Sequence, residues 1–200
     1  MISKKTSILL MLLLFLACSE NNPIITQEID NYIIHSLNAK GNNETLDIAT
    51  WNIEWFPKHE LTIEYVVESI DSLDVDIIAM QEITSTEELN ILSNELGDSW
   101  ATFRSGAVNS TYGELSYLIN TNTIEFNNDP YTILEWEAFG SANPFSYRAP
   151  FVFEFSYNNQ HFFLINIHFK CCGDGIIDPL DIYDEEFRRQ QSSELLHNYI

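Results

Sequence analysis

A strand-helix-strand pattern between residues 46 and 82 constrains the fold more than any other feature of the sequence. Residues 46–53 predict one strand, and residues 75–80 are apolar almost without interruption, as is typical of a strand buried on both faces. Five apolar residues at helical spacing predict an amphipathic helix between them: Ile63, Val66, Val67, Ile70 and Leu73. The pattern favours an α/β sheet, and open α/β sheets build their sites where strands end.

Polar side chains stand where both of these strands end. Asn52 and Glu54 interrupt the end of the first strand, and Gln81-Glu82 follows the second. Carboxylate and amide oxygens are the ligands that hard cations prefer, so these two strand ends together indicate a hard-metal site. Glu54 lies two residues from Asn52 on the same strand face and would act further from the metal. Taken singly, Glu82 could merely begin a helix, and Asn52 could be a satisfied core amide.

The remaining elements are predicted from a helix-capping motif and from the alternation of apolar and polar residues. Ser85-Thr86-Glu87-Glu88 is a capping box that predicts a second helix. The chain then becomes rich in strands, with a hairpin turn at Asn158-Asn159, and ends in a helix over 183–200. No return strand follows that helix, so we expect the chain to be cut within a larger domain. The predicted strands cover residues 100–104, 115–119, 131–136, 151–156 and 161–168.

Residues 1–18 have the pattern of a secretory signal: Lys4 and Lys5, then an apolar run too short to span a membrane. Their Phe-Leu-Ala-Cys ending resembles a bacterial lipobox, which predicts lipidation of Cys18 and a membrane anchor. The predicted location is then the outer membrane or cell surface. Ordinary cleavage near Ala17 is the alternative, with a periplasmic or secreted product. Residues 19–45 are predicted to form a tether, and residues 46–200 the folded domain.

The chain is strongly acidic, with a formal net charge of −21. This charge should repel the phosphate backbone of a nucleic acid at low salt, so a nuclease of this composition would need divalent cations. The simpler interpretation is that an acidic surface keeps an exported protein soluble.

Cys171 and Cys172 are the only cysteines beyond Cys18. Adjacent Cα atoms lie about 3.8 Å apart, below the usual disulfide span of roughly 4.4–6.8 Å, so a ring between the two would be strained. An oxidising compartment would still permit it, and the sequence leaves the redox state open. A zinc site is not indicated, because no second Cys or His pair stands at ligand spacing.

Further polar residues follow at the predicted strand boundaries: Tyr112, Glu114, Arg148, Asn166 and His168. The order of motifs resembles the endonuclease/exonuclease/phosphatase superfamily: Asn in a Trp-Asn-Ile strand, Gln-Glu, Tyr-x-Glu, Arg-x-Pro and Asn-x-His. The stretches Tyr112-Gly113-Glu114, Phe145–Val152 and Asn166-Ile167-His168 are most similar to its deoxyribonuclease I branch. The resemblance spans residues 46–200. It implies a two-sheet α/β sandwich with outer helices.

The resemblance also implies roles for these residues in phosphodiester hydrolysis. Glu82 would hold Mg²⁺, or Ca²⁺ or Mn²⁺, with Asn52 as an amide ligand or an orienting group. His168 would donate a proton, and Glu114 would hold its ring and raise its pKa. The predicted phosphate-binding residues are Arg148, Tyr112 and Asn166.

Two motifs of the family are missing from the sequence, namely Gly-Asp-x-Asn and a closing Ser-Asp-His. We therefore expect the 200-residue chain to show no hydrolysis above background. Nucleic acid is the favoured substrate of the complete site. The alternatives are a phosphomonoesterase or a sphingomyelinase-like phosphodiesterase acting on phospholipid. A non-catalytic surface lipoprotein or an inactive fragment is the expectation if the natural chain ends at Ile200. The sequence predicts no oligomeric state.

Overall fold

The computed structural model describes residues 40–200 except residues 43 and 108. The predicted signal and Cys18 lie outside the described residues, as does most of the predicted tether. No helix in the described part of the chain has both the length and the apolar character needed to cross a membrane.

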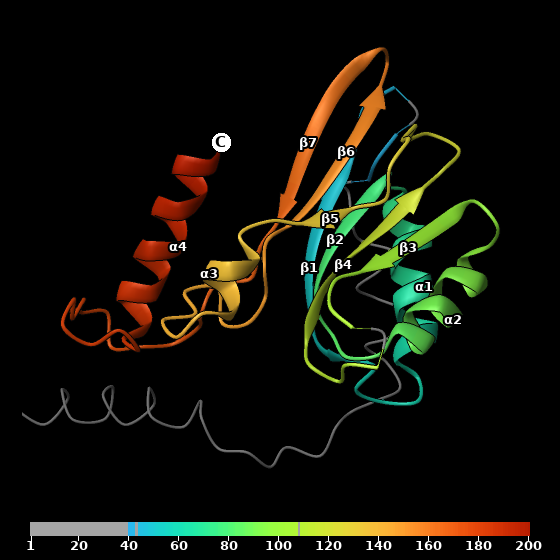
Figure 1. The fold of residues 1–200 in the computed structure, drawn as a ribbon. Coiled ribbons are helices and arrows are strands. Elements are labelled where there is room, and N and C mark those ends of the chain that lie inside the picture. Colours follow the sequence, from blue (N-terminus) through green and yellow to red (C-terminus); the bar gives the residue numbers. More distant parts are fainter. Residues whose placement is uncertain (1–39, 43, 108) are drawn as a thin grey trace, which may run out of the picture. The chain divides into compact units, whose positions relative to one another are not determined.

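The first sheet contains four strands in the order β1-β2-β4-β3 (Figure 1). Strands β1 and β2 are parallel, β4 is antiparallel to both of its neighbours, and helices α1 and α2 follow β1 and β2 along the chain. A Ser85 hydroxyl accepts a hydrogen bond from the Glu88 amide at the start of α2, which confirms half of the predicted capping box. The elements are β1 (Ile48–Phe56), α1 (Thr62–Leu73), β2 (Ile77–Ile83), α2 (Thr86–Leu96), β3 (Trp100–Arg104) and β4 (Glu114–Asn120).

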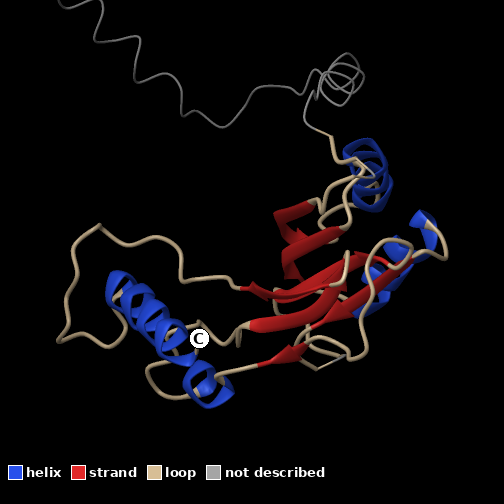
Figure 2. Cartoon of the chain, turned by 90° about the horizontal axis from the view of Figure 1, so that it is seen from above, coloured by secondary structure: helices blue, strands red, loops and turns tan. Residues whose placement is uncertain are grey.

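The second sheet contains three antiparallel strands in the order β5-β6-β7. Asn158 and Asn159 both adopt left-handed backbone angles between β6 and β7, as a tight hairpin turn requires. Figure 2 shows the helices outside the strands of the two sheets. The elements are β5 (Tyr131–Thr132), α3 (Glu135–Phe139), β6 (Phe151–Tyr157), β7 (Gln160–Asn166) and α4 (Glu185–Tyr199).

Each face of β2 packs against a different layer, which explains its continuous apolar sequence. Ile78 and Met80 pack with residues of α1 and α2 in one core cluster. Ile77 and Ala79 lie in a second cluster between the two sheets, with Tyr117 and Phe153. A third cluster joins α3 and α4 to the second sheet. The predicted two-sheet α/β sandwich with outer helices is therefore confirmed.

Several predicted boundaries differ from the structure. Strands β1 and β2 each continue three residues beyond their predicted ends at residues 53 and 80, so Gln81 and Glu82 lie within β2. The strand predicted over 131–136 stops after Thr132, because Leu134 adopts a left-handed conformation and α3 begins at the next residue. Strand β7 ends at Asn166, two residues before the predicted end at His168. His168 therefore lies on the loop that follows the sheet.

Candidate metal and phosphate site

Irregular backbone at the ends of β1 and β2 brings Asn52 and Glu82 together. Asn52 pairs with Gln81 in the parallel register, which then shifts between Asn52 and Phe56. Glu54, Trp55 and Glu82 all have positive φ angles, between 45° and 66°. Left-handed conformations cost non-glycine residues free energy and are concentrated at functional sites. These irregularities turn the Glu82 side chain toward Asn52.

Asn52, Glu82 and His168 form one cluster. The Asn52 Nδ2 donates a hydrogen bond to Glu82 Oε1 at 3.2 Å, and His168 Nε2 lies 3.6 Å from the same oxygen. The side chains of Glu82 and His168 are each 16% exposed. His168 Nδ1 is buried, and no described residue forms a hydrogen bond with it. The structure thus brings together both predicted metal residues and the predicted catalytic histidine.

This cluster opens into a cleft of about 490 Å³ that also contains most of the predicted phosphate-binding groups. Arg148, Lys170 and Arg188 line the cleft, whereas Glu82 is its one carboxylate among the described lining residues. The whole chain has only nine lysines and arginines, so three of nine face this one cleft. The cleft is therefore cationic within an acidic protein, as binding of an anion requires.

Arg148 and Tyr112 are held beside each other at the cleft. Arg148 Nε donates to the Gly113 carbonyl at 2.7 Å, and its guanidinium carbon lies 4.7 Å from the centre of the Tyr112 ring. The Tyr112 hydroxyl donates to the Ser146 carbonyl at 3.0 Å. Neither terminal nitrogen of Arg148 donates to another described residue, so both are available for the paired hydrogen bonds that a phosphate accepts.

The predicted pairing of Glu114 with His168 is wrong. Glu114 is buried on β4, where its carboxylate accepts hydrogen bonds from Ser110 Oγ at 3.1 Å and Ser105 Oγ at 3.5 Å. Burial raises the pKa of Glu114, and the hydrogen bonds and nearby Arg104 and Arg148 oppose that rise. Glu82, not Glu114, is the carboxylate beside His168.

The expected rise in the pKa of His168 is also wrong. Burial lowers its pKa below the ordinary value, the positive charge of Arg148 lowers it further, and Glu82 only partly opposes them. The imidazole is consequently neutral near pH 7 when the cleft holds no anion.

Asn166 does not face the cleft, contrary to its predicted role in phosphate binding. Its Nδ2 donates to the Met80 and Ser116 carbonyls at 2.8 and 3.0 Å, and its Oδ1 accepts from Gln81 Nε2 at 2.7 Å. Both amide hydrogens are used, and the residue is 3% exposed. Asn166 therefore fastens the two sheets together and has no free donor for phosphate.

Several cleft residues were not identified from the sequence as site residues. Trp55 and Tyr147 both line the cleft from left-handed positions, and Lys170, Tyr183 and Arg188 reach it from the chain after β7. No sequence pattern marks a left-handed tryptophan or tyrosine. Lys170 follows His168 by two residues, and that proximity was the one available signal.

The donor set at Glu82 fits a hard divalent cation. Glu82 Oε1 faces Asn52 and His168, and Oε2 accepts no hydrogen bond from a described residue. Magnesium is typically bound by one or two carboxylates together with waters and substrate phosphate. Asn52 directs its amide hydrogens at Glu82 while its Oδ1 accepts from the Glu54 amide, which favours the orienting role over direct ligation. The Glu54 carboxylate pairs with Lys58, at 2.6 Å.

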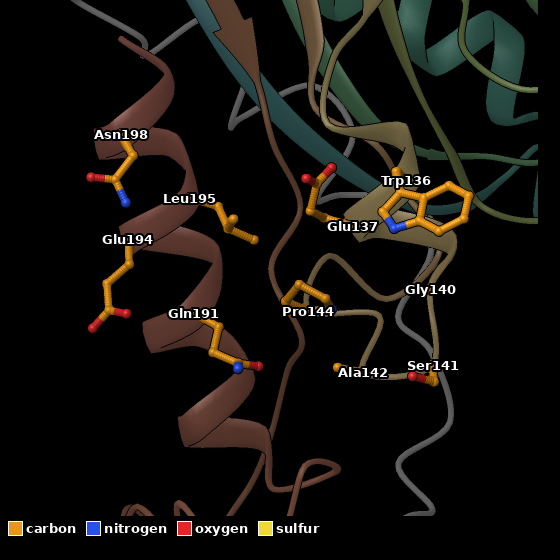
Figure 3. Close-up of a pocket in the computed structure, with 10 residues that line it drawn as sticks. All are labelled: Trp136, Glu137, Gly140, Ser141, Ala142, Pro144, Gln191, Glu194, Leu195 and Asn198. Carbon is orange, nitrogen blue, oxygen red and sulfur yellow. The ribbon is translucent and has the colours of Figure 1, made fainter.

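Two other features do not match this chemistry. A pocket of about 410 Å³ lies between α4 and the chain around α3 (Figure 3), but its lining includes Glu137 and Glu194 and no lysine or arginine. The carboxylates of Asp184, Glu185 and Glu186 lie within 4.8 Å of one another at the start of α4. Asp184 caps that helix and Glu186 pairs with Arg189, so both are used structurally.

Comparison with solved structures shows a shared fold. A crystal structure of D. rerio TDP2 complexed with single strand DNA product matches with a TM-score of 0.57 and 13% identity, over 76% of this chain and 52% of that one. A humanized D. rerio TDP2 with 14 mutations matches with a TM-score of 0.48 and 14% identity, over 60% and 48%. The chain thus spans about half the length of these structures. No family model and no curated protein matches the sequence. The fold is deoxyribonuclease I-like.

Proposed function

We propose that this chain carries the metal- and phosphate-binding residues of a site for metal-dependent phosphodiester hydrolysis, with nucleic acid as the favoured substrate. The observation that carries the proposal is the cleft lined by Glu82, His168 and Arg148, with Asn52 hydrogen-bonded to Glu82. One carboxylate with a free oxygen, a histidine and an arginine with free donors are the groups that bind a metal phosphate complex.

Each residue has a distinct part in this proposal. Glu82 would hold the divalent cation, Mg²⁺ or alternatively Ca²⁺ or Mn²⁺, and Asn52 would fix the orientation of its carboxylate. The bound cation would neutralise charge on the phosphate. Arg148 would donate two hydrogen bonds to phosphate oxygens from its free nitrogens. Tyr112 would hold the Arg148 guanidinium in place against its ring.

His168 would gain its proton when an anion binds. Burial and Arg148 lower its pKa in the empty cleft. A phosphate in the cleft would bring negative charge close to the imidazole and raise that pKa, against the lowering effects of burial, Arg148 and a cation on Glu82. The histidine would then carry a proton beside the substrate, where it can serve as a donor.

Aromatic side chains at the edge of the cleft support nucleic acid as the substrate. Trp55, Tyr147 and Tyr183 line the cleft and are 48%, 51% and 60% exposed. Exposed rings beside cations are the usual platform on which unpaired bases stack. The single-strand DNA product in the D. rerio TDP2 structure is consistent with this choice.

The first test is metal-dependent binding of a short fluorescent single-stranded DNA, measured by anisotropy in Mg²⁺ and in EDTA. We expect tighter binding in Mg²⁺, and we expect Glu82→Gln to abolish the difference. Glu54→Gln is the matched control, because Glu54 is exposed and pairs with Lys58 outside the lining of the cleft. Mg²⁺ dependence that survives in Glu82→Gln would contradict the proposal. Preferential binding to vesicles containing sphingomyelin, or to a phosphomonoester, would favour the alternative substrates.

We also propose that the protein is exported and anchored by a lipid on Cys18. The support is the sequence of residues 1–18. Cells expressing the full chain should incorporate labelled palmitate into the protein, and Cys18→Ser should abolish the incorporation. A native chain without label and with an amino terminus near residue 18 would instead show ordinary cleavage.

A further inference from the structure

Cys171 and Cys172 lie on the loop between β7 and α4, three and four residues after His168. Both are exposed, and the Cys172 thiol donates a hydrogen bond to the Cys171 sulfur at 2.9 Å. Cys171 also lines the cleft beside Lys170 and Phe169. Neither thiol has a part in the function proposed above. The molecule thus presents two touching nucleophilic sulfurs at the edge of its candidate active site.

The backbone around this pair is fixed by α4. Arg189 Nη1 donates to the Lys170 and Cys172 carbonyls at 3.0 and 2.8 Å, and Nη2 pairs with Glu186 at 2.9 Å. Cys172 and Gly173 both have positive φ angles, and a Cβ on Gly173 would overlap the Glu186 carboxylate. Arg189 and Glu186 therefore hold the loop in the observed conformation, in which the two sulfurs lie 2.9 Å apart.

We propose that Cys171 and Cys172 form a reversible redox site at the edge of the cleft, in a loop conformation held by Arg189, and that a small-molecule disulfide such as oxidised glutathione oxidises it to a cyclic disulfide. One cysteine thiolate attacks the small disulfide, forms a mixed disulfide and releases one thiol. The second cysteine attacks the protein sulfur of that mixed disulfide, closes the ring and releases the other thiol. The protein loses two electrons and two protons, and the small disulfide is reduced to two thiols.

The geometry makes this disulfide easy to reduce again. Adjacent Cα atoms are about 3.8 Å apart, whereas relaxed disulfides span roughly 4.4–6.8 Å, so ring closure strains the peptide between the cysteines. Strained and exposed disulfides have higher reduction potentials than buried structural ones and are the labile ones. Closure also converts the 2.9 Å contact between the sulfurs into a covalent bond, and Cys171 is a lining residue of the cleft. The site therefore couples the redox state of the surroundings to the shape of the cleft edge.

The order of attack is set by the hydrogen bond between the thiols. That bond to Cys171 raises the pKa of Cys172, because Cys172 is the donor. Cys171 accepts this hydrogen, and it is the cysteine of the pair that lines the cleft. We expect Cys171 to attack the small disulfide first and Cys172 to close the ring.

The test uses the full folded chain with Cys18→Ser, so that only these two thiols react. The reduced chain is incubated with oxidised glutathione, quenched in acid and analysed by intact mass. We expect loss of both thiol hydrogens without retained glutathione, and full reversal by dithiothreitol. Cys171→Ser and Cys172→Ser are matched controls, in which one bound glutathione should remain because no second thiol is available. Stable mixed disulfides on the chain with both cysteines, or no reaction at all, would overturn the proposal.

A second variant tests the role of the fold. Arg189→Gln removes the two hydrogen bonds to the loop carbonyls and the pair with Glu186. At a fixed ratio of reduced to oxidised glutathione we expect the cyclic fraction to fall several-fold. An Arg189→Gln chain that closes its ring as completely as the native chain would show that adjacency alone drives the reaction, and would overturn the assignment to this loop conformation. Neither measurement depends on nucleic-acid binding or hydrolysis.

Discussion

Two pairs of polar residues lie next to each other in the sequence but have different roles in the structure. Gln81 and Asn166 are buried between the sheets, where Gln81 Nε2 donates to Asn166 Oδ1 at 2.7 Å and both Asn166 amide hydrogens are used. Glu82 and His168 follow them by one and two residues and open onto the cleft. There Glu82 Oε1 and His168 Nε2 are 3.6 Å apart, and His168 Nδ1 is buried with no partner among the described residues.

The difference between the pairs is the completeness of their hydrogen bonding. A buried polar group with every partner in place rigidifies the fold, and its removal leaves the partners unsatisfied. A polar group with unused donors or acceptors beside a cleft is available to a ligand. Polar residues only one or two positions apart thus form a structural pair and a pair available for chemistry, and substitutions should distinguish the two.

The largest expected effect is on stability. Asn166→Ala removes the side-chain donor to the buried Met80 and Ser116 carbonyls and one of the three acceptors of Gln81 Nε2, so we expect a loss of about 3 kcal/mol, roughly a hundredfold in the folding equilibrium. His168→Ala removes buried contacts but no hydrogen bond between described residues, so we expect a smaller loss, of about 1 kcal/mol. Urea denaturation of both variants measures the contrast. Equal losses would remove the distinction between the pairs.

The next effect is on phosphate binding. Arg148→Gln keeps a planar donor near the Gly113 carbonyl but removes the charge and the paired donors. We expect affinity for single-stranded DNA in Mg²⁺ to fall roughly tenfold, since a charge-assisted hydrogen bond contributes about 1.5–3 kcal/mol. Lys58→Gln removes the same charge from an exposed position that pairs with Glu54, and should change affinity little. Equal losses in the two variants would indicate a general charge effect instead of a specific contact.

Much of this arrangement was predictable from the sequence. The apolar run at 75–80 predicted β2, and the parallel strand-helix-strand unit predicted that Asn52 and Glu82 would meet at neighbouring strand ends. Both inferences use only the periodicity of apolar residues and the rule that strand-helix-strand connections are right-handed.

Other parts depended on information that the sequence pattern lacks. Asn166 and His168 both follow apolar residues near the end of one predicted strand, and nothing there shows that one faces the opposite sheet and the other the cleft. Glu114 was paired with the wrong partner, because its serines come from a loop whose path follows from tertiary packing. The left-handed conformations of Leu134, Glu82 and Tyr147 are imposed by surroundings distant in sequence.

A smaller effect concerns the pKa of His168, measured by NMR in EDTA. Arg148 lowers this pKa and Glu82 raises it, so Arg148→Gln should raise it and Glu82→Gln should lower it. Because the folded-state pKa lies below the unfolded value, the unfolded chain binds the proton more tightly. Stability should therefore fall as the pH drops through the ordinary histidine pKa toward the folded one. His168→Gln should remove that part of the pH dependence. Shifts of the same sign in both charge variants would contradict the described cluster.

The smallest expected effect is at Glu114 and tests whether this buried carboxylate has its hydrogen-bonding partners as completely as the buried amides do. Burial raises the pKa of Glu114, so its contribution to stability is present below the unfolded pKa and is lost as the pH rises through the folded pKa. Glu114→Gln keeps an oxygen that can accept from Ser110 and Ser105, removes the charge, and loses the attraction of Arg104 and Arg148. These changes oppose each other, so we expect the free energy of unfolding to change by less than about 1 kcal/mol at neutral pH. The stability should also depend less on pH in the acidic range, which urea midpoints at several pH values would measure. A loss as large as that in Asn166→Ala would show that the hydrogen bonds and nearby arginines stabilise the ionised Glu114 as fully as the amide pair is stabilised. Complete hydrogen bonding would then not distinguish buried amides from buried carboxylates in this fold.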